Sequence, residues 1–94
     1  MMREADAVAL LGRALRAGAR SAGLHAVLKE ERSRPWMSAT FVGEVVEADL
    51  RVTGVGADAW LAGLSETDLP MRGWYLADLE VCDGALRALM LQAS

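Results

Sequence analysis

Residues 74–91 read WYLADLEVCDGALRALML, and the Asp83-Gly84 step inside them decides how this half of the chain folds. A two-residue hairpin of type I′ needs positive φ at both central residues, and Asp-Gly is one of the pairs that favour it most strongly. Apolar and polar residues alternate on both sides of the step, as they do in strands. We therefore predict two antiparallel strands joined by a tight turn at Asp83 and Gly84.

This turn sets which residues lie opposite each other, because side chains along a strand alternate with a period of two. Cys82 is then paired with Ala85, and Glu80 with Arg87, which brings opposite charges together across the strands as an ion pair. One face of the hairpin collects small and apolar residues suited to a core: Ala77, Leu79, Val81, Leu86, Ala88 and Met90.

The second face of the same hairpin is apolar where a solvated sheet should be polar. It is predicted to carry Trp74, Leu76, Leu89 and Leu91. Exposed apolar patches of this kind are typical of surfaces that bind a partner. We therefore predict that these four residues form a contact surface for another protein or a second copy of the chain.

Residues 4–22 show the three- and four-residue spacing of an amphipathic helix. Its predicted apolar side holds Val8, Leu11, Leu15, Gly18 and Ala22, and Gly23 follows as a left-handed stop. Three arginines share the opposite side: Arg13, Arg16 and Arg20. We add this basic stripe to the predicted partner-binding residues, because it suits an acidic protein surface or phosphate.

The middle of the chain completes an α+β pattern. Residues 24–32 alternate in a way that favours a strand, although a continued helix stays open, and Pro35 is predicted to end this segment. Residues 38–54 are predicted to form a hairpin with its turn at 46–49, and a short helix opens at Ala57 or Asp58. The predicted fold is a small antiparallel sheet of four to five strands with two helices on one face, in the order α-β-β-β-α-β-β.

Length and composition restrict the class of protein. The 94 residues suffice for one domain, which we place at 1–94. They are 53% hydrophobic, which is high for so small a chain and is a first indication of association. The formal net charge of −3 opposes general nucleic-acid binding, which requires a net basic surface.

The expected location is the cytoplasm. A single cysteine, Cys82, permits no internal disulfide and fits a reducing compartment. We see no signal peptide, and no apolar stretch approaches the ~20 residues needed to span a bilayer. The use of Arg in preference to Lys, together with abundant Ala and Gly, is associated with GC-rich bacterial genomes.

Residues that could carry chemistry do not form a recognisable motif. Cys82 and His25 are far apart in sequence, and one His with one Cys gives no zinc-binding pattern. The Gly54-Val55-Gly56 step lacks the third glycine of a dinucleotide-binding loop. We therefore predict no catalytic residue, no cofactor and no metal.

These observations lead to two hypotheses about function. The first is a non-enzymatic interaction or assembly module that associates with itself through the apolar outer face of the C-terminal hairpin. The alternative is a small-molecule-binding protein or enzyme with a pocket between helices and sheet, in which Asp78, His25 and Arg72 would be the polar groups.

Overall fold

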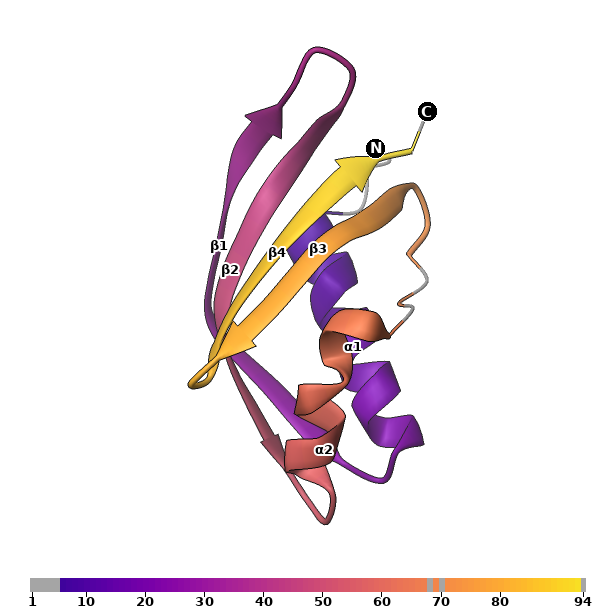
Figure 1. The fold of residues 1–94 in the computed structure, drawn as a ribbon, viewed down its shortest axis with the longest axis vertical. Helices are drawn as coiled ribbons and strands as arrows, with labels where there is room; N and C mark the ends of the chain where they lie inside the picture. The colour runs from indigo at the N-terminus through magenta and orange to yellow at the C-terminus, as the bar shows by residue number, and fades with distance from the viewer. Residues whose placement is uncertain (1–5, 68, 70, 94) are drawn as a thin grey trace, which may run out of the picture.

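The computed structural model describes residues 6–67, 69 and 71–93. Its four strands form one antiparallel sheet in the order β1-β2-β4-β3. Both helices lie on the same side of this sheet (Figure 1), so the predicted α+β class is confirmed. The elements in chain order are α1 (Ala7–Ser21), β1 (His25–Met37), β2 (Val42–Thr53), α2 (Ala57–Ala62), the 3₁₀ turn η1 (Leu64–Glu66), β3 (Trp74–Cys82) and β4 (Ala85–Gln92).

Helix α1 lies within the predicted range 4–22: it begins at Ala7, after the N-cap Asp6, and ends before Gly23 as predicted. Residues 4 and 5 of that range lie outside the described residues. The Asp6 carboxylate accepts a hydrogen bond from the Val8 N–H at 3.2 Å, which satisfies one of the unpaired donors of the first turn. Gly23, with φ of 78°, follows the last turn in the left-handed region. The buried side of the helix comprises Ala7, Leu10, Leu11, Gly12, Leu15 and Ala19.

The core lies between α1 and one face of the sheet. Leu11 and Leu15 are fully buried there, and η1 adds Leu64 from the second helical segment. Burying each such side chain contributes roughly 1.5–3 kcal/mol, which makes this one layer the main source of stability. The sheet residues of the same cluster are Ala26, Val46, Ala48, Leu50, Leu79, Leu86, Ala88 and Met90.

The first hairpin differs from the prediction. The predicted turn at 46–49 is wrong, because residues 42–53 form one continuous strand that pairs with β1 on one side and with β4 on the other. The chain turns earlier, at Ser38, whose N–H donates to the Phe41 carbonyl at 2.8 Å and whose hydroxyl accepts from the Phe41 N–H at 3.1 Å. The sheet therefore has four strands, and the predicted order is matched apart from the split of 38–54.

Pro35 does not end the strand that contains it, as we had predicted. Pro35 lies within β1, opposite Glu44 of β2, and β1 continues to Met37. Because β1 is an edge strand, a residue without an N–H can face away from the sheet without leaving a partner unpaired. Residues 25–32, for which helix had remained open, belong to this strand.

The C-terminal hairpin forms around the predicted turn. Asp83 and Gly84 have φ of 50° and 82°, the two positive values that a type I′ turn requires. The predicted pairs from Cys82 with Ala85 to Asp78 with Leu89 are all present. A β-bulge then shifts the register between Leu76 and Asp78.

We expect Gly84→Ala to lower the free energy of unfolding by about 1–2 kcal/mol, because alanine is strained at positive φ. A Cβ there would meet only the Leu50 carbonyl oxygen at 3.7 Å, so the cost comes from the backbone and not from a collision. Gly63→Ala is the matched control, since Gly63 has φ of −93° and its nearest contact is also at 3.7 Å. Urea unfolding followed by circular dichroism measures both, and equal stability of the two variants would contradict the turn assignment.

Candidate contact surface

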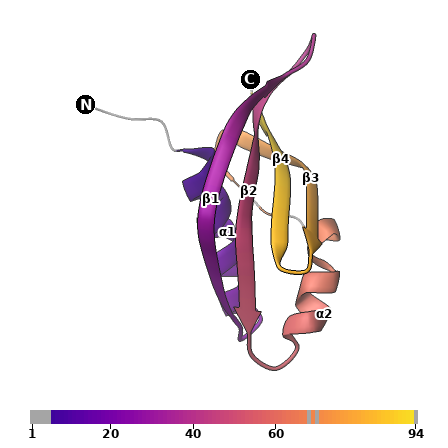
Figure 2. The same cartoon turned by 90° about the vertical axis from the view of Figure 1, so that its left-hand side faces the viewer.

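The side of the sheet that carries no helix is here called the outer face. Figure 2 views the molecule from this side, with the strands in front of the helices. The strand registers place its residues in rows that run across the sheet from β1 through β2 and β4 to β3. The apolar row is Trp36, Gly43, Leu91 and Tyr75, the mixed row is Arg34, Val45, Leu89 and Asp78, and the charged row is Arg32, Glu47, Arg87 and Glu80.

The apolar and mixed rows make one end of the outer face apolar. Val45 is only 5% exposed yet lies outside the core cluster, because it is shielded by neighbours on the outer face. Leu89 and Leu91 are half-buried beside it, and Tyr75 is 59% exposed. Leu89, Leu91 and Tyr75 lie on the face without helices, so water or a partner must cover their exposed parts.

Gly43 allows a close approach between β2 and β4 in the middle of the apolar row. A Cβ at this position would collide with the carbonyl oxygen of Met90 and come within 3.0 Å of the Leu91 Cα. The sheet can therefore form here only if residue 43 has no side chain.

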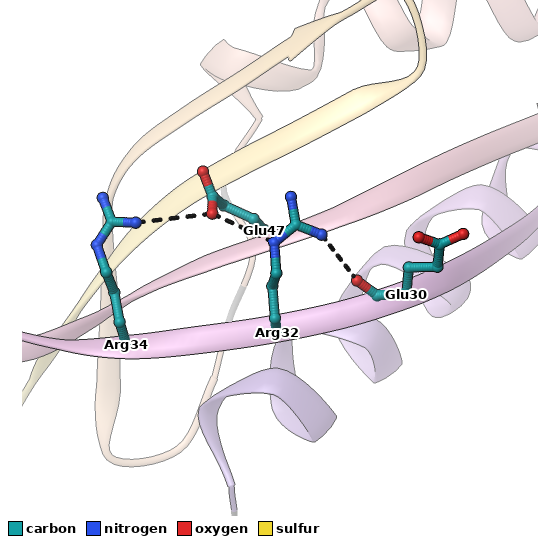
Figure 3. Close-up of polar contacts among 4 residues, drawn as sticks. All are labelled: Glu30, Arg32, Arg34 and Glu47. Carbon is teal, nitrogen blue, oxygen red and sulfur yellow. Dashed lines mark hydrogen bonds and ion pairs between the residues drawn. The ribbon is translucent and has the colours of Figure 1, made fainter.

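Ion pairs lie along the charged row (Figure 3). Glu47 contacts Arg32 at 3.5 Å and Arg34 at 3.7 Å, and Arg32 also donates to the Glu30 carbonyl at 3.2 Å. Glu80 and Arg87 lie opposite each other as predicted, but the ion pair predicted between them is not formed within 4.0 Å. Arginines exposed to this degree contribute little stability through such pairs.

The four apolar residues predicted for the contact surface are divided between the two faces. Leu89 and Leu91 lie on the outer face as predicted. Trp74 and Leu76 do not: both pack against the core on the helix side. The bulge at Ala77 is the reason, because one extra residue reverses the alternation beyond it and pairs Leu76 with Met90 and Tyr75 with Leu91.

The contact surface predicted from the sequence left out three outer-face residues. Tyr75 takes the place expected for Trp74 and Leu76, and Trp36 and Val45 come from the first hairpin. Trp36 and Val45 belong to this surface because β2 pairs with β4, which places the first hairpin beside the second. No local sequence motif indicates this pairing. The position of Tyr75 on the outer face could not be predicted, because no glycine or proline marks the bulge in the sequence.

The basic stripe of α1 lies on the other side of the molecule. Arg13, Arg16 and Arg20 are exposed on the helix that covers the inner face, so the structure does not join them to Leu89 and Leu91. Arg13 instead borders an open hollow of about 610 Å³ between α1 and the ends of β3 and β4. The hollow is lined by Leu10, Arg13, Arg72, Gly73, Trp74, Gln92 and Ala93.

The polar groups of the alternative hypothesis are not brought together. Arg72 lines this hollow, Asp78 is exposed on the outer side of β3, and His25 is exposed at the start of β1. Cys82 is an exposed thiol beside the β3–β4 turn, and both β2 and β4 lie between its strand and β1. Among residues 6–67, 69 and 71–93, no three His, Cys, Asp or Glu side chains gather as they would around a metal ion.

Two further findings bear on function. Within the part of the chain that the structure describes, no helix has the length and apolar character needed to cross a bilayer. No protein-family model, curated protein or solved structure matches the chain. The functional argument therefore depends on the surfaces themselves.

The bulge at Ala77 predicts that two neighbouring substitutions differ strongly in their effect on stability. Leu76→Asp should lower the free energy of unfolding by about 2 kcal/mol or more, because it places a carboxylate against the core. Tyr75→Asp should change it by less than about 0.5 kcal/mol, because Tyr75 is exposed. Urea unfolding at low protein concentration tests this, and the reverse ranking would show regular alternation without a bulge.

Proposed function

We propose that this protein is a non-enzymatic assembly module that associates with itself through the outer face of its sheet. The observation that carries the proposal is the apolar end of that face, where Trp36, Leu89 and Leu91 are half-buried and Tyr75 is exposed with no helix over them. Antiparallel sheets that face water on one side normally carry polar residues there.

The edges of the sheet are poor sites for association, which favours the face. Edge strand β1 is interrupted by a bulge between Lys29 and Arg32 and contains Pro35. Edge strand β3 is interrupted by the bulge at Ala77 and carries Asp78 and an exposed Glu80 beyond it. Bulges, proline and charge on an edge strand all oppose pairing with another strand.

Location in a reducing compartment such as the cytoplasm is part of the same proposal. It is supported by the exposed, unpaired thiol of Cys82 at the end of β3. An oxidising compartment would expose this thiol to disulfide formation between copies.

The test of self-association is Leu89→Glu. This residue lies near the centre of the outer face, so a carboxylate there should convert the oligomer to monomer. The matched control is Val55→Glu, which adds the same charge at a residue that is 98% exposed in the loop before α2. Light scattering after size-exclusion chromatography reads out the mass, and a native chain that stays monomeric at high concentration would exclude the proposal.

A second candidate function, the binding of a small anion with an apolar part, is supported by the hollow beside α1. Arg13 and Arg72 supply positive charge to it, and Leu10 and Trp74 supply apolar walls. Aromatic carboxylates combine these two properties.

Benzoate and inorganic phosphate are suitable probes of the hollow. We expect benzoate to shift the Trp74 indole N–H resonance with millimolar affinity, and Arg72→Ala to weaken this binding about tenfold, as loss of a charge-assisted contact does. Arg51→Ala, on the outer face, is the control that should leave binding unchanged. If benzoate bound equally well to the Arg72→Ala and Arg51→Ala variants, as judged by the shift of the Trp74 resonance, the hollow would not be its binding site.

A further inference from the structure

We infer that two copies of this chain pack outer face to outer face about a two-fold axis that runs nearly parallel to the strands, between β2 and β4. This inference rests on the proposed self-association and adds the geometry of the dimer. It is carried by the order of charges along the rows of the outer face.

Such an axis has a simple effect on the rows. It reverses the order of the strands in the second copy, so that β1 faces β3 and β2 faces β4, while each row stays level with itself. The same surface patch is then used by both copies, as a closed two-fold interface requires.

The charged row becomes complementary to itself under this operation. Its signs across the sheet are positive, negative, positive and negative: Arg32, Glu47, Arg87 and Glu80. Reversal places Arg32 over Glu80 of the second copy and Glu47 over its Arg87. Every charge in the row therefore meets the opposite sign, and Arg34 meets Asp78 in the same way in the mixed row.

The apolar row brings apolar side chains together under the same operation. Trp36 faces Tyr75 of the second copy, and Leu91 faces its Gly43. Trp36 and Leu91 are half-buried and Tyr75 is 59% exposed, so this contact would remove apolar surface from water.

The charged side chains of the outer face can form further ion pairs with a second copy. The Arg32 and Arg34 side chains are 64% and 57% exposed although both already contact Glu47. A guanidinium has five N–H donors, so a second carboxylate can be accommodated. Glu80 and Arg87 form no ion pair with each other.

Other two-fold arrangements of the same faces are disfavoured. An axis perpendicular to the strands would place β1 over β1, which brings Lys29, Arg32 and Arg34 against the same residues of the second copy. It would likewise place Asp78 and Glu80 of one β3 against those of the other. Like charges in such contact reduce affinity strongly.

The dimensions suit a reversible dimer. Facing sheets lie about 10 Å apart, a gap that an arginine and a glutamate reaching from opposite sides can span. The outer face is four strands wide, at about 4.8 Å per strand, and eight residues long in β4, at about 3.4 Å per residue. Its area is therefore roughly 500 Å² per copy. The total of about 1,000 Å² lies at the lower limit of specific interfaces, so we expect micromolar affinity.

Charge reversal on two separate chains tests the geometry. Arg32→Glu alone places glutamate over Glu80 twice, and Glu80→Arg alone places arginine over Arg32 twice. Each variant should therefore weaken its own dimer at least about tenfold. Mixed in equal amounts they should form a heterodimer, because both contacts then join opposite charges. Analytical ultracentrifugation with one variant labelled measures both effects.

The outcomes separate the two proposals. A monomeric native chain overturns the proposed self-association itself. A native dimer with no heterodimer from the mixed variants overturns only the two-fold geometry. Should Arg32→Glu fail to fold, because it lies beside Glu47, the pair Arg34→Asp and Asp78→Arg replaces it with the same expectation. Glu66→Arg, at an exposed residue of η1, is the charge-reversal control that should leave the native dimer intact.

Discussion

One layer of helix covers one side of a four-stranded sheet, and the other properties of the molecule depend on this constraint. Burial of α1 against Val46, Leu50, Leu86 and Met90 supplies a single core. A domain of 94 residues buries only about 60–65% of its unfolded surface, so this core takes most of what the chain can bury. The second face of the sheet then has no cover of its own, and its composition determines what the protein can bind.

The parts of the fold that follow from local chemistry could be predicted from the sequence. Positive φ at Asp83 and Gly84 and a stop at Gly23 are backbone requirements that few residues meet, so their presence is informative. The amphipathic spacing of α1 likewise reflects one buried side. Together these signals give the class of fold and the register next to the turn.

The remaining features depend on tertiary pairing or on a one-residue irregularity. The division of 38–54 into two strands was wrong because β2 lies in the middle of the sheet and is stabilised by both neighbours over its full length. The prediction that Trp74 and Leu76 lie on the outer face was wrong because no glycine or proline marks the bulge at Ala77. A bulge of this kind moves every residue beyond it to the other side, so one unmarked position changed the composition of the candidate surface.

The outer face combines a small apolar end with alternating charges, and the two parts have different roles in the proposed dimer. Its edge columns are basic on β1 and acidic on β3, so they select the direction of packing. They oppose a slide by one row, which would itself break the two-fold symmetry, only weakly, because Arg32 would still lie over an acid, Asp78. The central columns do not tolerate it, because the slide would move the Glu47 carboxylate away from Arg87 of the second copy and bury it against an apolar side chain, Leu89. Orientation is thus specified at the edges and register at the centre. An apolar face alone would specify neither, because burial of apolar surface has no direction.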